Sequence, residues 1–161
     1  MSKFRLVRVD FRLIHGQVIT KWLKHAGADK IVIVDDTLAQ DEFMRQIYTM
    51  SAPAGIDVDV HSIADAMEAW NENNFGSDKI LLLIRDVNTI YTLINDGLPV
   101  DRLQIGGLGA APDRKKVYGP ISLNQDDYDQ LKSLNDSGVE VVLHQVPDEP
   151  EMQFNKIKVK F

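Results

Sequence analysis

The sequence predicts an α/β fold, in which three layers (α/β/α) are built on one open, mostly parallel twisted sheet of about six strands with helices on both faces. Two observations predict it. Strand patterns and helix patterns alternate from one end of the chain to the other, as in right-handed βαβ units. In addition, Lys30 to Val34 and Lys79 to Ile84 are apolar at nearly every position, which is typical of strands that helices cover on both faces.

The first elements form one strand–helix–strand unit. Phe4 to Val9 alternates enough to predict a first strand, and Val18 to His25 has the amphipathic spacing of a short helix. Lys30 to Val34 is then the first fully buried strand. Because parallel neighbours need a crossover, the helix is expected to join two strands of one sheet.

A single helix is predicted between this strand and residue 50. Its apolar residues recur at spacings near 3.6. One residue of Asp35-Asp36-Thr37 can cap its start, while Pro53 and Gly55 mark its end. The apolar positions that define the helix are Leu38, Phe43, Met44, Ile47 and Met50.

The middle of the chain repeats the same order. Asp57 to His61 alternates between apolar and polar residues and predicts a third strand. Ser62 is suited to cap a helix over Ile63 to Trp70, and the polar stretch Asn71 to Ser77 predicts a loop. Lys79 to Ile84 is the second fully buried strand.

The rest of the chain continues the alternation, so residues 1–161 are expected to form a single domain. The tail, Pro147 to Phe161, is expected to pack loosely or to form a short helix. The other predicted elements are a helix over Val87 to Asn95, a strand over Arg102 to Ile105, a connection or short edge strand over Ile121 to Leu123, a helix capped by Asn124 or Asp126, and a strand over Val139 to Gln145.

Composition excludes several classes of protein. A net charge of −6 argues against nonspecific binding to nucleic acid. The chain has no cysteine, which excludes disulfides, thiol catalysis and cysteine-based metal sites. No apolar run approaches the roughly 20 residues that span a bilayer, and Met1 to Phe4 does not resemble the start of a signal peptide. A cytoplasmic protein is therefore expected.

The chemistry is concentrated in the turn between the first strand and the first helix. His15 lies there beside Gly16 and three residues after Arg12. On its own, a histidine near a helix start is most often a cap or a surface residue. Here the apolar pair Leu13 and Ile14 should hold the turn against the core. A nucleophilic imidazole, free N–H groups at a helix start and a guanidinium together suit a bound phosphoryl group.

Other polar or glycine-rich stretches also follow predicted strands. The segments Asp10 to Gly16, Asp35-Asp36, Arg85-Asp86 and Gly106 to Gly109 should lie on one edge of the sheet, because parallel strands end together there. Ligands of such sheets bind at this edge. The strand pattern thus places His15 on the expected binding rim.

Rival sites are weaker. Gly106 to Gly109 is not followed by the third glycine or the helix start that dinucleotide binding requires. Its small residues are instead expected to let the backbone pass close to the His15 loop or to a docking partner. Asp35 or Asp36 could accept a phosphoryl group or bind Mg²⁺, although a helix cap is the simpler role. The other histidines lack metal-ligand spacing and are expected on the surface or in loops. They are His25, His61 and His144.

The residues of this turn carry a family resemblance. Asp-x-Arg-Leu-Ile-His-Gly-Gln-Val, residues 10–18, resembles the active-site loop of IIB components of the mannose/fructose/sorbose family, which belong to the bacterial phosphoenolpyruvate-dependent sugar phosphotransferase system. Supporting matches are Ser51 to Gly55, Ile105 to Gly107 and Val139 to Val141, so the resemblance covers the whole chain. Phe11 stands where the family commonly has a second acidic residue.

The resemblance implies a function as a phosphocarrier. By it, His15 takes a phosphoryl group on Nδ1 from a phosphohistidine of a IIA component and passes it to a sugar carried by membrane IIC and IID components. Arg12 would stabilise the phosphoryl charge, the N–H groups of Gly16 and Gln17 would bind its oxygens, and Asp10 would orient Arg12 or the imidazole within the phosphate site. No metal or other cofactor is needed.

The sequence leaves some alternatives open. A phospho-receiver or regulatory binding domain with Asp35 or Asp36 as acceptor would use the same fold class. A structural paralogue without catalytic activity is a further alternative. Neither the sugar nor the oligomeric state follows from the residues, and a homo-oligomer remains open.

Overall fold

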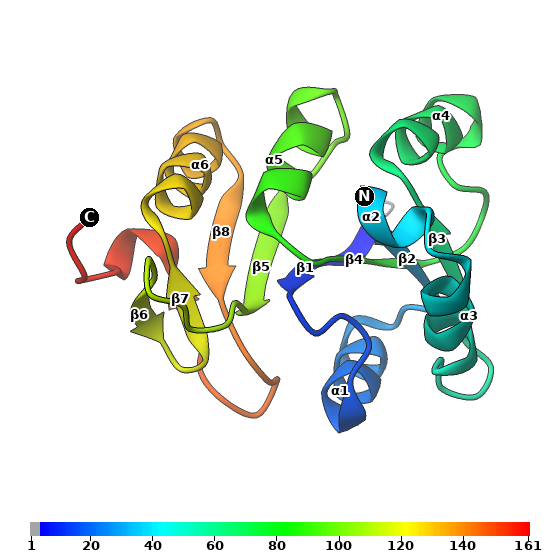
Figure 1. Cartoon of the computed structure of the whole chain (residues 1–161), viewed down its shortest axis with the longest axis horizontal. Helices are drawn as coiled ribbons and strands as arrows, with labels where there is room; N and C mark the ends of the chain where they lie inside the picture. Colours follow the sequence, from blue (N-terminus) through cyan, green and yellow to red (C-terminus); the bar gives the residue numbers. More distant parts are fainter. Residues whose placement is uncertain (1–3) are drawn as a thin grey trace.

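The computed structural model describes residues 4–161, so the expectation about a signal peptide lies largely outside the described residues. Its centre is a seven-stranded sheet with the order β3-β2-β4-β1-β5-β8-β9, in which only β9 is antiparallel to its neighbour (Figure 1). In chain order the strands are β1 (Phe4–Asp10), β2 (Lys30–Val34), β3 (Asp57–His61), β4 (Ile80–Ile84), β5 (Arg102–Gly107), β8 (Glu140–Leu143) and β9 (Met152–Gln153).

Helices cover both faces of this sheet, which confirms the predicted three-layer α/β/α fold (Figure 1). Two apolar clusters lie on opposite faces. One is formed with α1, α2 and α3, and the other with α4, α5 and α6. The helices are α1 (Gly16–Ala26), α2 (Asp36–Ala39), α3 (Glu42–Met50), α4 (Ile63–Asn73), α5 (Val87–Asn95) and α6 (Gln125–Asp136).

The strand order creates a switch point beside β1. After β1 the chain crosses toward β2 on one side, and after β5 it crosses toward β8 on the other side. From the adjacent parallel strands β1 and β5, the chain therefore crosses toward opposite sides of the sheet. Ligands of open α/β sheets bind in the crevice at the carboxyl ends of such a pair. This crevice adjoins the loop that carries His15.

The buried strands agree with the predictions. Every residue of β4 is buried, and in β2 only Lys30 is partly exposed. Burying a leucine or isoleucine side chain stabilises the fold by about 1.5–3 kcal/mol, so these two strands contribute strongly to the core. None of the helices within residues 4–161 combines the length and the apolar character needed to cross a bilayer.

The single helix predicted up to residue 50 is wrong, because the chain forms two helices there. The carboxylate of Asp41 accepts a hydrogen bond from the N–H of Met44 (3.1 Å) and starts α3 as a new N-cap. The predicted apolar positions divide between the two sides: Leu38 and Met44 pack against the core, whereas Phe43 is 70% exposed and Met50 83% exposed. Tyr48, which was not in the pattern, also packs on the inner side.

The C-terminal part also differs from the predictions. Residues 121–123 are not an edge of the main sheet but form a hairpin, with β6 (Lys115–Tyr118) paired to β7 (Ile121–Leu123). Elsewhere one of two predicted alternatives is confirmed. Asn124 caps α6. The tail forms a short 3₁₀ helix (η1, Phe154–Lys156), which the additional strand β9 precedes. Burial of Phe154 explains why, since it fixes the tail on the core.

Candidate functional site

The loop from β1 to α1 is held by Leu13, as the sequence predicts. Leu13 has a positive φ of 55° and is 0% exposed. A left-handed conformation costs a leucine about 1–2 kcal/mol, whereas burying its side chain stabilises by about 1.5–3 kcal/mol. Its N–H also donates to the carbonyl of Asp10 (3.0 Å). Burial thus outweighs the backbone strain and fixes the residues on either side.

His15 starts α1 without capping it. Its side chain makes no cap hydrogen bond and is 21% exposed. Nδ1 lies 2.8 Å from the carbonyl oxygen of Leu13. Because a carbonyl only accepts, Nδ1 carries a proton in this conformation. Nε2 is buried, lies 3.7 Å from Oδ2 of Asp10, and has no hydrogen-bond partner among residues 4–161.

Asp10 lies at the centre of the site. The carboxylate is 0% exposed and ends strand β1. Its Oδ1 accepts from the N–H (3.1 Å) and the Nε–H (3.2 Å) of Arg12. Its Oδ2 accepts from Nη2 of Arg12 (3.3 Å) and of Arg8 (3.2 Å). The carboxylate therefore orients Arg12 and faces the imidazole of His15, the two roles considered from the sequence.

Arg12 is held by one edge of its guanidinium. Nε and Nη2 form a fork on Asp10, and the ring of Phe11 lies 5.6 Å from the guanidinium carbon. The side chain is 34% exposed. Among the described residues, none accepts a hydrogen bond from Nη1. This nitrogen is therefore free to contact an anion on the side of the site that faces solvent.

The glycines after β5 make room for the loop. A Cβ atom at Gly107 would lie 3.0 Å from Oδ1 of Asp10 and 3.1 Å from Nη2 of Arg12. A Cβ atom at Gly109 would lie 3.4 Å from the ring of Phe11. The carbonyl of Gly107 also accepts from the N–H of Phe11 (3.0 Å). This confirms that small residues here let the backbone pass close to the His15 loop.

The start of α1 adjoins the imidazole. Gly16 and Gln17 are the first residues of this 11-residue helix, and both are exposed. The first N–H groups of a helix have no intrahelical acceptor. The first turn contains no acidic side chain that would compete for them. The two residues named from the sequence therefore lie where an anion beside His15 could reach them.

The other residues of the predicted rim serve structural roles. Asp35 caps α2, since its carboxylate accepts from the N–H of Leu38 (2.9 Å). Asp36 accepts from the N–H of Ile63 (2.8 Å). The expectation that one of this pair caps a helix is confirmed. Arg85 lies 4.0 Å from Asp35, so the ends of β2 and β4 do meet on this edge.

The remaining histidines are not alike. His25 is exposed, as expected. His144 lies in the loop that follows β8, one of the two expected locations, but it is buried there, with its Nε2 2.6 Å from the carbonyl of Glu149. His61 ends β3 and is partly buried. Within residues 4–161, no three His, Cys, Asp or Glu residues come close enough together to hold a metal ion.

Sequence reasoning missed Arg8. This arginine is 0% exposed and contacts Asp10 from within the core. Side chains two residues apart on a strand point to the same face, so an arginine two residues before Asp10 was a usable signal. An arginine in the interior of a strand needs a partner when it is buried.

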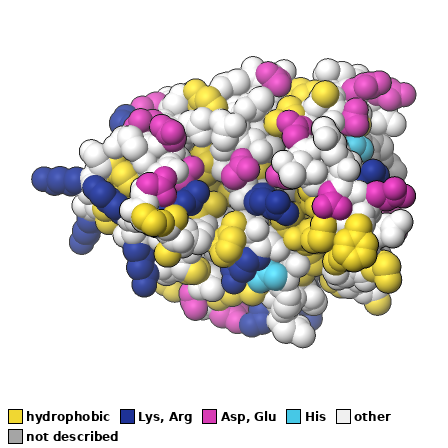
Figure 2. Space-filling view, viewed as in Figure 1, with side chains coloured by type: hydrophobic (Ala, Val, Ile, Leu, Met, Phe, Trp, Pro, Cys, Tyr) yellow, Lys and Arg dark blue, Asp and Glu magenta, His cyan; other side chains and the backbone are white. Residues whose placement is uncertain are grey.

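The surface around the site is mixed in character. Figure 2 shows a histidine beside basic side chains in the lower middle of this face, over the β1–α1 loop of Figure 1. Hydrophobic side chains gather to their right, over α3. Phe43, Ile47 and Met50 are the exposed apolar residues of that helix. An apolar surface therefore lies on the same face as the site.

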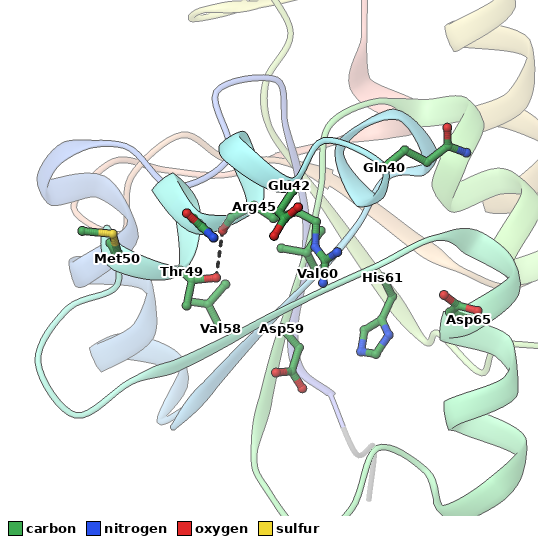
Figure 3. Close-up of a pocket in the computed structure, with 11 residues that line it drawn as sticks. Gln40, Glu42, Arg45, Thr49, Met50, Val58, Asp59, Val60, His61 and Asp65 are labelled. Atoms are coloured by element: carbon green, nitrogen blue, oxygen red, sulfur yellow. Dashed lines mark hydrogen bonds between the residues drawn. The ribbon is translucent and has the colours of Figure 1, made fainter.

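A separate groove of about 880 Å³ lies between α3 and the edge strand β3. In Figure 3, Arg45 and Thr49 of α3 face the strand, and His61 lies between Asp59 and Asp65. His15, Arg12 and Asp10 are not among its lining residues. This hollow is therefore distinct from the site on the β1–α1 loop.

The groove leads to a prediction about stability. Burial lowers the pKa of His61 below its ordinary value of 6.5, against the opposite effect of Asp59 and Asp65. Below about pH 6.5 the unfolded chain then binds more protons than the folded chain, so acid removes stability. We expect His61→Gln to gain stability relative to the wild type as pH falls from about 7.5 to about 5.5, measured by urea unfolding. If the difference in free energy of unfolding between the variant and the wild type were the same at both pH values, this prediction would be wrong.

Comparisons with known proteins show the family of the chain. The sequence model of the sorbose subfamily IIB component of the phosphotransferase system (PTS) matches residues 4–160. A sorbose-specific EIIB component of Lacticaseibacillus casei is 31% identical over 145 residues, which make up 90% of this chain and 88% of that relative. The crystal structure of manxB from Thermoanaerobacter tengcongensis is 38% identical, with a TM-score of 0.89, and the match covers 94% of this chain and 92% of that one.

A further relative is longer than this chain. The mannose-specific EIIAB component of Escherichia coli (strain K12) is 28% identical over 148 residues. The match covers 92% of this chain but 46% of that relative, so this chain spans about half of its length. The family match over almost the whole chain, together with the fold and the loop geometry, means that the chain belongs to the sorbose-type family of PTS IIB components.

Proposed function

We propose that the chain is a sugar-specific phosphocarrier in which His15 is the phosphorylated residue. The observation that carries this proposal is the geometry of the β1–α1 loop. It holds His15, the free edge of Arg12 and the start of α1 around one position. These are the groups that stabilise a phosphoryl group during transfer.

The first step takes the phosphoryl group from a phosphohistidine of a IIA component. The N–P bond of the donor breaks, a new N–P bond forms on His15, and the proton of the His15 ring passes to the donor imidazole. Arg12 supplies charge to the phosphoryl oxygens through Nη1. The N–H groups of Gly16 and Gln17 add the helix start, which contributes about 0.3–1 kcal/mol and therefore assists without dominating.

The second step passes the group to a sugar. A sugar hydroxyl attacks phosphorus, the N–P bond of His15 breaks, and the hydroxyl proton returns to the ring. We propose that the sugar is presented by membrane IIC and IID components, on the cytoplasmic side of the membrane. The EIIAB name of one relative supports a IIA component as the donor. No metal or other cofactor enters either step.

The expected nucleophile is Nδ1, which donates to the carbonyl of Leu13 in this conformation. Transfer to Nδ1 therefore requires the ring to leave Leu13. With the proton on Nε2, Oδ2 of Asp10, now 3.7 Å away, is available as an acceptor. Asp10 then favours the tautomer whose Nδ1 lone pair is free to attack. The carboxylate acts on the ring and on Arg12, not on the phosphoryl oxygens, which it would repel.

Labelling with phosphoenolpyruvate, the general phosphotransfer proteins and a IIA domain tests this function. We expect one phosphorylated site, stable in alkali and mapped to the peptide that contains His15. Phosphohistidine survives alkali, whereas an acyl phosphate does not. An alkali-labile label mapped to Asp35 or Asp36 would overturn the proposal in favour of an aspartate acceptor. Those two carboxylates already accept hydrogen bonds from backbone N–H groups, which speaks against that alternative.

A further inference from the structure

Arg8 connects the site to the core of the molecule. Its Nη1 donates to Oε1 of Gln104 on β5 and to the carbonyl of His144 (2.9 Å), which follows β8. Its Nη2 donates to the carbonyl of Gln145 (2.9 Å) and to Oδ2 of Asp10 (3.2 Å). One guanidinium thus joins β1 to β5 and to the segment after β8, and its last contact is with the carboxylate of the site.

The surroundings of Arg8 leave it little freedom to move. The guanidinium carbon lies 5.3 Å from the ring centroid of Trp22 on α1, and the indole N–H of Trp22 donates to the carbonyl of Gln145 (2.8 Å). On β5, a Cβ atom at Gly106 would overlap the guanidinium of Arg8. The glycine is therefore required for the arginine to occupy this place, so β5 and α1 confine the guanidinium between them.

The charge of Arg8 matters as well as its position. Burial lowers its pKa to about 10, although Asp10 acts in the opposite direction, so Arg8 remains cationic near neutral pH. Asp10 is the one carboxylate in contact with it within residues 4–161. Buried ion pairs are often no more stabilising than apolar residues of similar size. Stability alone therefore does not explain why this buried ion pair is present.

The contacts of Asp10 with the site explain the ion pair. Its Oδ2 faces Nε2 of His15, and both of its oxygens hold the fork of Arg12. A carboxylate can rotate about its bond to Cβ, and rotation would release these partners. Arg8 donates a hydrogen bond to Oδ2 from the core side, which opposes that rotation. The other hydrogen bonds of Arg8 go to backbone carbonyls and to Gln104, none of which belongs to the His15 loop.

We propose that Arg8 is a positioning residue for phosphoryl transfer, which acts on His15 and Arg12 through Asp10. It does not touch the phosphoryl group, since it is 0% exposed. It holds the carboxylate in the orientation that directs the free edge of Arg12 outward and offers an acceptor to Nε2 of His15. This inference rests on the proposed function and adds a residue to its machinery.

The test measures single-turnover transfer from phosphorylated IIA to the folded full chain. We expect Arg8→Met to lower the rate roughly 10- to 100-fold, as for residues that orient catalytic groups. The KM for phosphorylated IIA should stay unchanged, because Arg8 lies away from the surface. Arg8→Lys, which keeps the charge but not the fork, should recover part of the rate. Val9→Ala is the matched control: Val9 is the next residue of β1, is 0% exposed and points to the opposite face.

Two further measurements separate positioning from a merely structural role. If Arg8 acts through Asp10, Arg8→Lys should change the rate of transfer less than about threefold in a chain that already carries Asp10→Asn. The reason is that the effects of substitutions at coupled residues do not add. The ¹⁵N shifts of the His15 ring in the unphosphorylated protein should change in Arg8→Lys and not in Val9→Ala. The ring shifts do not require transfer, so they test the inference even if Arg8→Met fails to fold.

Other outcomes would overturn the inference. A rate for Arg8→Met and Arg8→Lys that matches Val9→Ala would do so, as would an effect of Arg8→Lys that is equally large with and without the Asp10 carboxylate. These results differ from a failure of the proposed function itself. In that case the wild type would take no label on His15, whereas here the wild type transfers normally and only the Arg8 variants behave unexpectedly.

Discussion

Replacing His15 with glutamine is expected to reduce phosphoryl transfer from IIA by at least about 10³-fold, because the variant has no nucleophile to form the N–P bond. The fold should change little. The side chain is 21% exposed and forms one hydrogen bond, to the carbonyl of Leu13, which a glutamine amide can also donate. Its loss would cost about 0.5–1.5 kcal/mol at most. The measurements are the initial rate of labelling and the thermal midpoint.

His25→Gln is the matched control for this variant. Both histidines belong to the first helical segment, His15 as the residue before α1 and His25 within its last turn. His25 is exposed and lies at the other end of the helix, away from Asp10 and Arg12. It should therefore label at the rate of the wild type. If His15→Gln were labelled at the rate of the wild type, His15 would not be the nucleophile, even if the label were stable in alkali.

The fold was predictable where one physical signal dominated. Ile80 to Ile84 is apolar throughout, and that pattern fits a strand buried on both faces, as β4 is. Asp86 and Ser62 accept hydrogen bonds from N–H groups three residues later, so the starts of α5 and α4 follow from local chemistry. Elements of this kind do not depend on distant contacts.

The errors arose where a local pattern left two outcomes open. Leu38 to Met50 has helical spacing, but Asp41 offers a second cap, and tertiary packing decided that α3 should bury Met44 and expose Phe43. The local pattern of the tail left a loose segment and a short helix both open. Its place was decided by distant contacts, in which β9 pairs with β8 and Phe154 packs in the core.

The candidate site shows the same division. The turn with His15, Arg12 and Asp10 could be identified from residue types at short spacing. The spacing of Arg8 and Asp10 was a usable signal for their contact, but the burial of Arg8 was not predictable, because its other partners are Gln104 and the carbonyls of residues 144 and 145, about a hundred or more positions away in the chain. The direction of the imidazole also depends on the backbone of Leu13, whose positive φ no leucine would suggest.

Replacing Arg12 with lysine is expected to slow transfer by about 10- to 1000-fold. Arginines that act on transferring phosphoryl groups contribute about 10³–10⁵ in rate, and lysine retains the part due to charge alone. Lysine cannot hold Asp10 with one edge and a phosphoryl oxygen with another, because its ammonium is a point charge. In the structure the fork on Asp10 occupies Nε and Nη2, so the lost function is that of the remaining nitrogen, Nη1.

The stability of this variant should fall more than for an ordinary surface position. Arg12 pairs with a carboxylate that is 0% exposed, and lysine can keep one of the two side-chain hydrogen bonds. Losing the other costs about 1–2 kcal/mol, reduced by the partial exposure of Arg12. For a chain of this size that is a drop of roughly 2–8 °C in thermal midpoint.

Arg102→Lys separates the two effects of the Arg12 substitution. Arg102 also pairs with carboxylates, those of Glu140 and Glu151. It begins β5, so it lies at the amino ends of the parallel strands, whereas the His15 loop lies at their carboxyl ends. Its replacement should lower the thermal midpoint without changing the rate of transfer. If Arg12→Lys behaved like Arg102→Lys, with a lower midpoint and a wild-type rate, Arg12 would only brace Asp10. A slow rate in Arg12→Lys alone would show that Arg12 takes part in transfer, through Nη1 or through Asp10, and does not only stabilise the fold.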